Sequence, residues 1–163
     1  MPEVRAGQGP AGEVCEAPAE AATKWRLEDV GRWAAENSDR IVVLPRAIAA
    51  CRKSQYAEPQ HLFDALELLA GPYRLEKTNQ APRGSIKARV DQLGMEIGGS
   101  VDRSRVTEDY VVRWRGRRRW LDQHLKKGGS RDPRFCLRVY FTWDEELEMA
   151  VVGWAPSHLD NSM

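Results

Sequence analysis

The spacing of apolar residues changes once along this 163-residue chain, between about residues 95 and 108. Before that point apolar residues recur three and four positions apart, which is the spacing of one helix face. After it they alternate with polar residues, as in a half-buried strand. The two halves predict an α+β fold, in which N-terminal helices over about residues 25–95 pack on an antiparallel sheet of about four strands over about 108–158.

The first part predicts four helices. Leu27, Val30 and Trp33 give the first helix its apolar spacing. Prolines suit the first turn of a helix, so two of them open the second and third helices, and a serine can cap the fourth. A short β-branched run, residues 41–43, precedes the second helix. The residues that we expect to start or end helices are Pro45, Pro59, Gly71-Pro72, Ser85 and Gly94.

The second part predicts a hairpin and then a pair of longer strands. Residues 110–115 alternate, and Gly116 and its neighbours can turn the chain. Residues 118–126 can return antiparallel, although a short helix is also compatible with them. Residues 134–144 form the clearest strand pattern, and after a polar turn residues 148–155 return as its partner.

Residues 1–22 contain mostly Ala, Glu, Gly and Pro and almost nothing large and apolar. Such a segment buries too little surface to offset its chain entropy, so we expect a disordered leader before a single domain over residues 23–163. There is no apolar run of about 18 residues and no secretion-signal pattern, so neither a membrane span nor a membrane partner is expected, and a cytoplasmic location is the default.

Several classes of site have no support in the sequence. The three cysteines are far apart and no Cys/His group has zinc spacing, so no metal site is expected. The chain also lacks a Gly-rich phosphate loop, HExxH, GxSxG and an EF-hand loop. These absences argue against nucleotide hydrolysis, zinc peptidase and serine hydrolase activity, and no cofactor is predicted.

The formal net charge of +1 conceals a strongly basic block. Residues 83–138 carry 15 basic and 7 acidic side chains, whereas residues 139–163 carry five acids and no lysine or arginine. Within the block, "RWRGRRRW" (residues 113–120) sets arginines beside two tryptophans. Arginine binds phosphate through two parallel hydrogen bonds and indole faces stack on bases, so this mixture suits a nucleic-acid surface.

A structural explanation of the same block competes with this one, because arginines also keep sheet edges from pairing and strand tryptophans are usually core residues. The candidate nucleic-acid-binding residues are Arg113, Trp114, Arg115, Arg117, Arg118, Arg119, Trp120, Lys127, Arg131 and Arg134.

A second group of residues could carry chemistry. Asp122 and His124 are two positions apart, so on a strand they share a face, where Asp122 could orient the imidazole. Lys126 would lie on that face too. A general base beside a cation is an arrangement that can cleave a phosphodiester, although an Asp-x-His pattern also occurs often by chance.

Arg138 and Tyr140 share a face of a later strand, and the sequence leaves open whether that face looks outward or inward. His158 follows the last strand, and a strand end is a common place for a functional side chain. The candidate catalytic residues are therefore His124, Arg138 and His158, supported by Asp122 and Lys126.

The stretches "HLKKGGSRDPRFCLRVYFTWD" and "VVGWAPSHLDN" resemble the C-terminal part of a module of uncharacterised bacterial proteins, and "IVVLPRAIAACRKSQY" with "LFDALELLA" fits its upstream part. More distantly, "LRVYFTWD" with "MAVVGWAPSHL" is similar to the last two strands of RelE/ParE-type toxins. That resemblance implies helices on an antiparallel sheet and cleavage of mRNA without a metal. It matches Arg138 to the strand arginine and His158 to the terminal histidine, whereas Leu159 stands where an arginine often follows.

Two hypotheses follow. The first is a nucleic-acid-binding protein, with RNA favoured over DNA, which in its stronger form is a toxin-like, metal-independent endoribonuclease. The second is a non-enzymatic interaction or regulatory domain of a bacterial defence or regulatory complex, whose basic hairpin binds an acidic protein partner.

Overall fold

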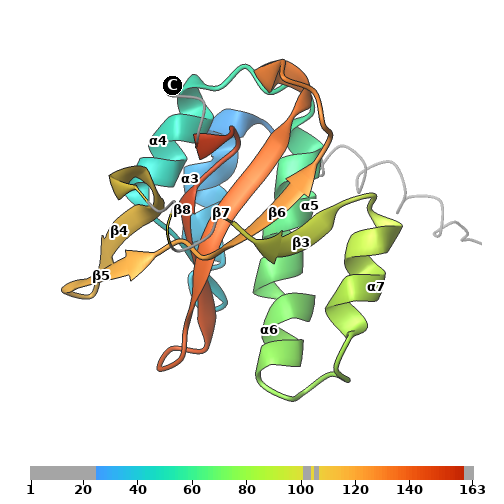
Figure 1. Cartoon of the computed structure of the whole chain (residues 1–163), viewed down its shortest axis with the longest axis vertical. Coiled ribbons are helices and arrows are strands. Elements are labelled where there is room, and N and C mark those ends of the chain that lie inside the picture. Colours follow the sequence, from blue (N-terminus) through green and yellow to red (C-terminus); the bar gives the residue numbers. More distant parts are fainter. Residues whose placement is uncertain (1–24, 101–103, 105–106, 160–163) are drawn as a thin grey trace, which may run out of the picture.

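The computed structural model describes residues 25–100, 104 and 107–159, and the predicted leader lies outside them. Helices occupy most of the first part of this region and strands most of the second (Figure 1). The α-helices are α3 (Val30–Glu36), α4 (Pro45–Lys53), α5 (Pro59–Ala70), α6 (Pro72–Lys77) and α7 (Ser85–Gln92). The strands are β2 (Ile41–Val43), β3 (Glu96–Gly99), β4 (Val111–Trp114), β5 (Arg117–Trp120), β6 (Gln123–Lys127), β7 (Leu137–Asp144) and β8 (Met149–Trp154). Short 3-10 turns are η1 (Leu27–Asp29), η3 (Glu108–Tyr110) and η4 (Pro133–Phe135).

The α+β class is confirmed, and the sheet differs from the expectation in its strands. It has five strands in the order β2-β8-β7-β6-β3, while β4 and β5 form a separate two-stranded sheet. β2 comes from the N-terminal half and runs parallel to β8, so the sheet is mixed rather than antiparallel. A parallel neighbour needs a long connection, and the helices between β2 and β8 lie within it. The short run Ile41–Val43 did not indicate that its partner would be β8, more than 100 residues later in the sequence.

One face of the five-stranded sheet is covered by the helices. Alternate residues of β7, Leu137, Val139 and Phe141, lie on this face and pack with the buried Leu62 and Leu66 of α5. Every second side chain of β7 therefore packs against the apolar side of α5, as the sequence spacing predicts. We call this side the helical face.

The opposite side, the outer face, is covered in part by the β4–β5 hairpin. Its core contains Tyr110, Val112, Leu121, Tyr140 and Val151. This second core is separate from the first because successive side chains of β7 and β8 point to opposite faces. The hairpin thus forms a second, smaller layer on the sheet.

A tight turn and one glycine allow the hairpin to pack there. Arg115 and Gly116, the two central residues of its turn, have φ angles of 53° and 80°, as the favoured two-residue hairpin turn requires. A Cβ on Gly153 of β8 would lie 2.6 Å from Leu121 and 2.9 Å from Val112. The missing side chain lets these two residues approach the sheet backbone.

The predicted helix boundaries hold with two differences. Gly71-Pro72 ends α5, and Pro72 then opens the further short helix α6. The prediction that Ser85 caps α7 is wrong, because Ser85 is the first residue of this helix and Gly84 occupies the cap position. The carboxylate of Glu76 instead accepts hydrogen bonds from the backbone N–H of Gly84 and Ile86, at 2.9 and 2.7 Å, and these bonds lower its pKa.

Candidate functional site

Four of the predicted catalytic candidates meet on the outer face, beside the part that the hairpin covers. His124 of β6 pairs across the sheet with Tyr140 of β7, and Lys126 pairs with Arg138. The His124 and Tyr140 rings stack with centroids 5.7 Å apart, and the His158 ring meets Tyr140 edge-on at 6.3 Å. We call these five residues the histidine cluster.

Burial and neighbouring charges keep His124 neutral. Burial has the largest effect, and the positive charges of Lys126, Arg138 and His158 add to it, so the pKa of His124 falls to about 4. A hydrogen bond with the Gly99 backbone acts in the opposite direction and is weaker. At pH 7 the imidazole is therefore uncharged although Lys126 and Arg138 lie beside it.

The Nδ1 atom of His124 is buried and has no hydrogen-bond partner among the described residues. Leaving a buried polar group unsatisfied costs about 1–3 kcal/mol, so a buried ring nitrogen without a partner calls for an explanation. A polar group of a bound molecule would supply the missing partner.

The sequence left open which way the face shared by Arg138 and Tyr140 looks. In the structure both residues lie on the outer face, opposite the helices. Arg138 Nη1 donates to the backbone carbonyls of Gly128 and Leu137, at 3.0 and 2.8 Å. A guanidinium has five N–H donors, so others remain for a ligand. Lys126 Nζ lies 3.5 Å from Glu96 Oε1 across the strands, in a partly exposed ion pair.

Asp122 does not join this cluster. It precedes β6, so the alternation that would put it beside His124 does not extend to it. Its charge acts instead on Tyr73 of α6, whose pKa is raised to about 12, chiefly by burial. The predicted Asp122–His124 pair is not formed among the described residues.

Space beside His124 is open. Gly98 of the edge strand β3 is its cross-strand partner, and a Cβ built on Gly98 would meet nothing within 4 Å. Sequence reasoning missed Gly98, although a glycine inside a strand often marks a place where another backbone or a ligand approaches closely.

The basic hairpin divides its arginines between two faces. Cross-strand partners share a face, so Trp114 and Arg117 lie together with Arg119 toward the five-stranded sheet. Arg113 and Arg118 pair with each other on the face that looks away from it. The five-arginine block is therefore not one continuous surface.

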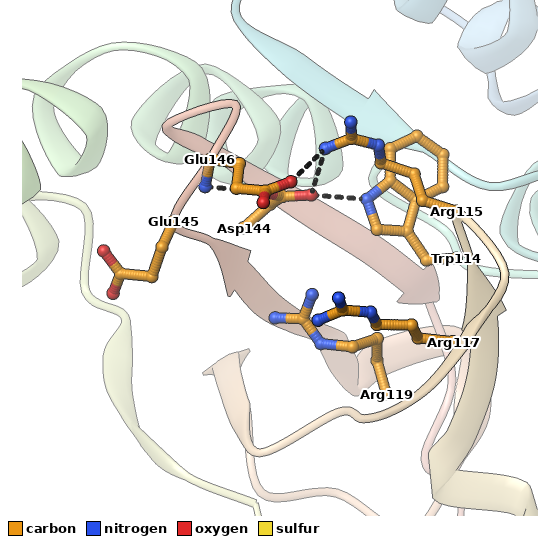
Figure 2. Close-up of a pocket in the computed structure, with 7 residues that line it drawn as sticks. All are labelled: Trp114, Arg115, Arg117, Arg119, Asp144, Glu145 and Glu146. Carbon is orange, nitrogen blue, oxygen red and sulfur yellow. Dashed lines mark hydrogen bonds and ion pairs between the residues drawn. The ribbon is translucent and has the colours of Figure 1, made fainter.

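Acidic side chains neutralise part of the hairpin. Arg115 lies 3.1 Å from Glu146 and 3.7 Å from Asp144, whose Oδ2 accepts a 2.7 Å hydrogen bond from Trp114 Nε1 (Figure 2). Arg118 makes two hydrogen bonds, of 2.8 and 3.2 Å, to Glu108. Trp114 is thus held by a carboxylate and packs against the outer core, which argues against a freely exposed stacking ring.

The other predicted binding residues lie apart from one another. Trp120 also packs against the outer core. Lys127 points to the helical side and donates to the Leu93 carbonyl at the end of α7, at 2.7 Å. Arg134 is paired with Asp132 at 2.6 Å, and Arg131 is exposed.

Among the described residues, no three His, Cys, Asp or Glu side chains gather closely enough to hold a metal ion. No helix in this region combines the length and apolar character needed to cross a membrane. Comparisons with protein-family models, characterised proteins and solved structures found no match to this chain. The resemblance to RelE/ParE-type toxins therefore stays a hypothesis.

Proposed function

We propose that this protein binds RNA on the outer face of its sheet and cleaves it at the histidine cluster with side chains alone. One observation supports this most directly. His124 is a neutral imidazole with a buried, unpartnered ring nitrogen, and it lies beside the cations Lys126 of β6 and Arg138 of β7. A general base beside cations is what phosphodiester cleavage needs.

In the proposed reaction, Nδ1 of His124 accepts the proton of a ribose 2′-hydroxyl while that oxygen attacks the adjacent phosphorus. The bond from phosphorus to the 5′-oxygen breaks, and His158 donates a proton to the leaving oxygen. Arg138 and Lys126 stabilise the charge on the phosphoryl oxygens. The products are a 2′,3′-cyclic phosphate and a 5′-hydroxyl. Nδ1 is buried in the free protein, so a side chain around it must move when RNA binds.

The test uses labelled single-stranded RNA incubated with pure protein in EDTA. We expect cleavage with cyclic phosphate ends, and a loss of at least about 10²-fold in rate in His124→Ala with RNA affinity retained. The matched control is His61→Ala, because His61 lies on α5 beside Tyr56 and outside the cluster. Intact RNA with the wild-type protein would contradict the cleavage step, while a shifted, uncut band would still support RNA binding.

A second candidate function is a non-enzymatic domain that binds an acidic protein segment. The observation that favours it is the carboxylate of Glu108, which already binds Arg118 with two hydrogen bonds on the outward face of the hairpin. A partner's carboxylate can take the same position. Binding of an acidic peptide that Arg118→Gln abolishes and His124→Ala leaves unchanged would support this function over cleavage.

A further inference from the structure

A pocket of about 340 Å³ lies between the β4–β5 hairpin and the turn that joins β7 to β8. Trp114, Arg115, Arg117 and Arg119 line it from the hairpin, and three acidic residues line it from the turn. Figure 2 shows the guanidinium groups of Arg117 and Arg119 extending from β5 into this space. The pocket lies outside the histidine cluster.

The charges in this pocket do not simply cancel. Arg115 is paired with Asp144 and Glu146 at one wall. Glu145 is exposed, and in Figure 2 its carboxylate points away from the Arg117–Arg119 pair. Two positive charges therefore face the open space of the pocket, with no carboxylate paired to either among the described residues.

The two guanidinium groups differ in how firmly they are held. Arg119 Nη2 donates to the Trp143 carbonyl at 2.8 Å, which fixes its direction and leaves its other N–H groups available. Arg117 has no hydrogen-bond or ion-pair partner in the part of the chain that the structure describes. Both stand on a strand whose register is fixed by a tight turn, so the backbone already holds the two side chains on the same face of the hairpin.

We propose that this pocket is a binding site for a phosphoryl group, held by Arg117 and Arg119. Two adjacent guanidinium groups repel each other unless an anion lies between them, and the planar fork of N–H donors matches phosphate oxygens. The pocket also has room for more than a phosphate alone, so a phosphate within a larger molecule fits it.

The position of the pocket suggests the source of that phosphate. Asp144 at the pocket and Arg138 at the histidine cluster lie six residues apart on β7, a distance of roughly 20 Å along a strand. If the protein acts on RNA as proposed above, a single RNA molecule can place one of its phosphates in the pocket and a second phosphate at the histidine cluster. The assignment of RNA as the source of the phosphate rests on the proposed function, whereas the phosphoryl site itself does not.

The experiment is a titration with inorganic phosphate at constant ionic strength, followed by the NMR signal of the Trp114 indole N–H. We expect a saturable shift in the wild type, and an affinity about tenfold or more weaker in Arg117→Gln, since a charge-assisted hydrogen bond is lost. Arg89→Gln on α7 makes the same change in net charge away from the pocket and should leave the shift intact. Glu145→Gln should strengthen binding, because it removes a nearby negative charge.

No saturable shift in the wild type, or equal losses in Arg117→Gln and Arg89→Gln, would overturn the site. A second titration uses a single-stranded RNA oligonucleotide. Weaker RNA binding in Arg117→Gln than in Arg89→Gln supports a nucleic-acid backbone as the source, and equal RNA binding with weakened phosphate binding assigns the pocket to a smaller phosphate ester. Neither arm measures cleavage, so a failure of the proposed function is seen separately.

Discussion

His124 and Tyr140 are direct cross-strand partners, and their rings lie nearly parallel, at an interplanar angle of 21°. Tyr140 also accepts a hydrogen bond from the Leu159 backbone N–H through its hydroxyl, at 3.3 Å. The tyrosine therefore joins the strand that carries His124 to the segment that carries His158. Antiparallel pairing in this way brings together two histidines that are far apart in the sequence.

The pKa of His124 should respond to its cationic neighbours. Lys126→Gln removes one of the positive charges that disfavour the imidazolium form, so the pKa should rise from about 4. An NMR titration of the His124 ring protons measures this, with Lys87→Gln on α7 as a control of equal charge change. An unchanged pKa in Lys126→Gln would mean that the Lys126 charge does not contribute to the value.

Acid should destabilise the protein in part through the same residue. Above pH about 6.5 His124 is neutral in both the folded and the unfolded chain. As the pH falls from about 6.5 toward 4, the unfolded chain binds a proton that the folded protein does not, so the free energy of unfolding decreases. His124→Gln should therefore lose less stability than the wild type between pH 7 and 5 in urea denaturation. Equal losses would contradict the lowered pKa.

Gly153→Ala should destabilise the protein by about 1–3 kcal/mol, because its Cβ would overlap Leu121 and Val112 under the hairpin. Gly98→Ala is the control, since a Cβ there meets nothing within 4 Å and the change should stay within about 1 kcal/mol. Urea midpoints of the two variants give the comparison. A Gly153→Ala protein as stable as the wild type would show that the hairpin can shift away from the sheet.

Asp144→Ala should cost about 1–3 kcal/mol of unfolding free energy. Its buried carboxylate accepts hydrogen bonds from Trp114 Nε1 and from the backbone N–H groups of Glu146 and Leu147. These bonds and the Arg115 charge lower its pKa in spite of burial, so this stabilisation should be lost as the pH falls through that pKa. Glu145→Ala, the exposed neighbour, should stay within about 0.5 kcal/mol in the same thermal or urea denaturation.

If RNA binds the hairpin, Glu108→Gln should increase RNA affinity, because it releases Arg118 from its two-bond ion pair. The freed guanidinium can contact one more phosphate, which steepens the slope of log affinity against log salt by about 0.7 for a single strand. Fluorescence anisotropy at several salt concentrations measures both effects. An unchanged slope would place Arg118 outside the RNA-binding surface.

The sequence predicted most helices and the β7–β8 pair, because their signals are local. Pro45 and Pro59 begin helices where expected. Over Leu137–Asp144 every second side chain lies on the helical face, which is the alternation expected of a strand. The meeting of His124 with Arg138 was not predictable in this way. It depends on which strands become neighbours, and alternation in one strand carries no information about its partner.

The hairpin shows the other limit of sequence reasoning. Five arginines within seven residues predict a basic surface, yet pairing directs Arg117 and Arg119 to one side and Arg113 and Arg118 to the other. Glu108 and Glu146 of the β7–β8 turn then form ion pairs with Arg118 and Arg115, which neutralise part of the positive charge of the hairpin. Only the register of the strands and the tertiary contacts distinguish a continuous patch from a divided one.

The two faces of the sheet carry two separate apolar cores of unequal size. The helical face unites helices and strands in one large apolar cluster, whereas the outer core rests on a short hairpin and a few residues around it. A unit with so few buried contacts opens at a lower free energy than the whole protein. We therefore expect the hairpin to open more often than the helical layer, so that the area of sheet that a ligand can reach varies with time.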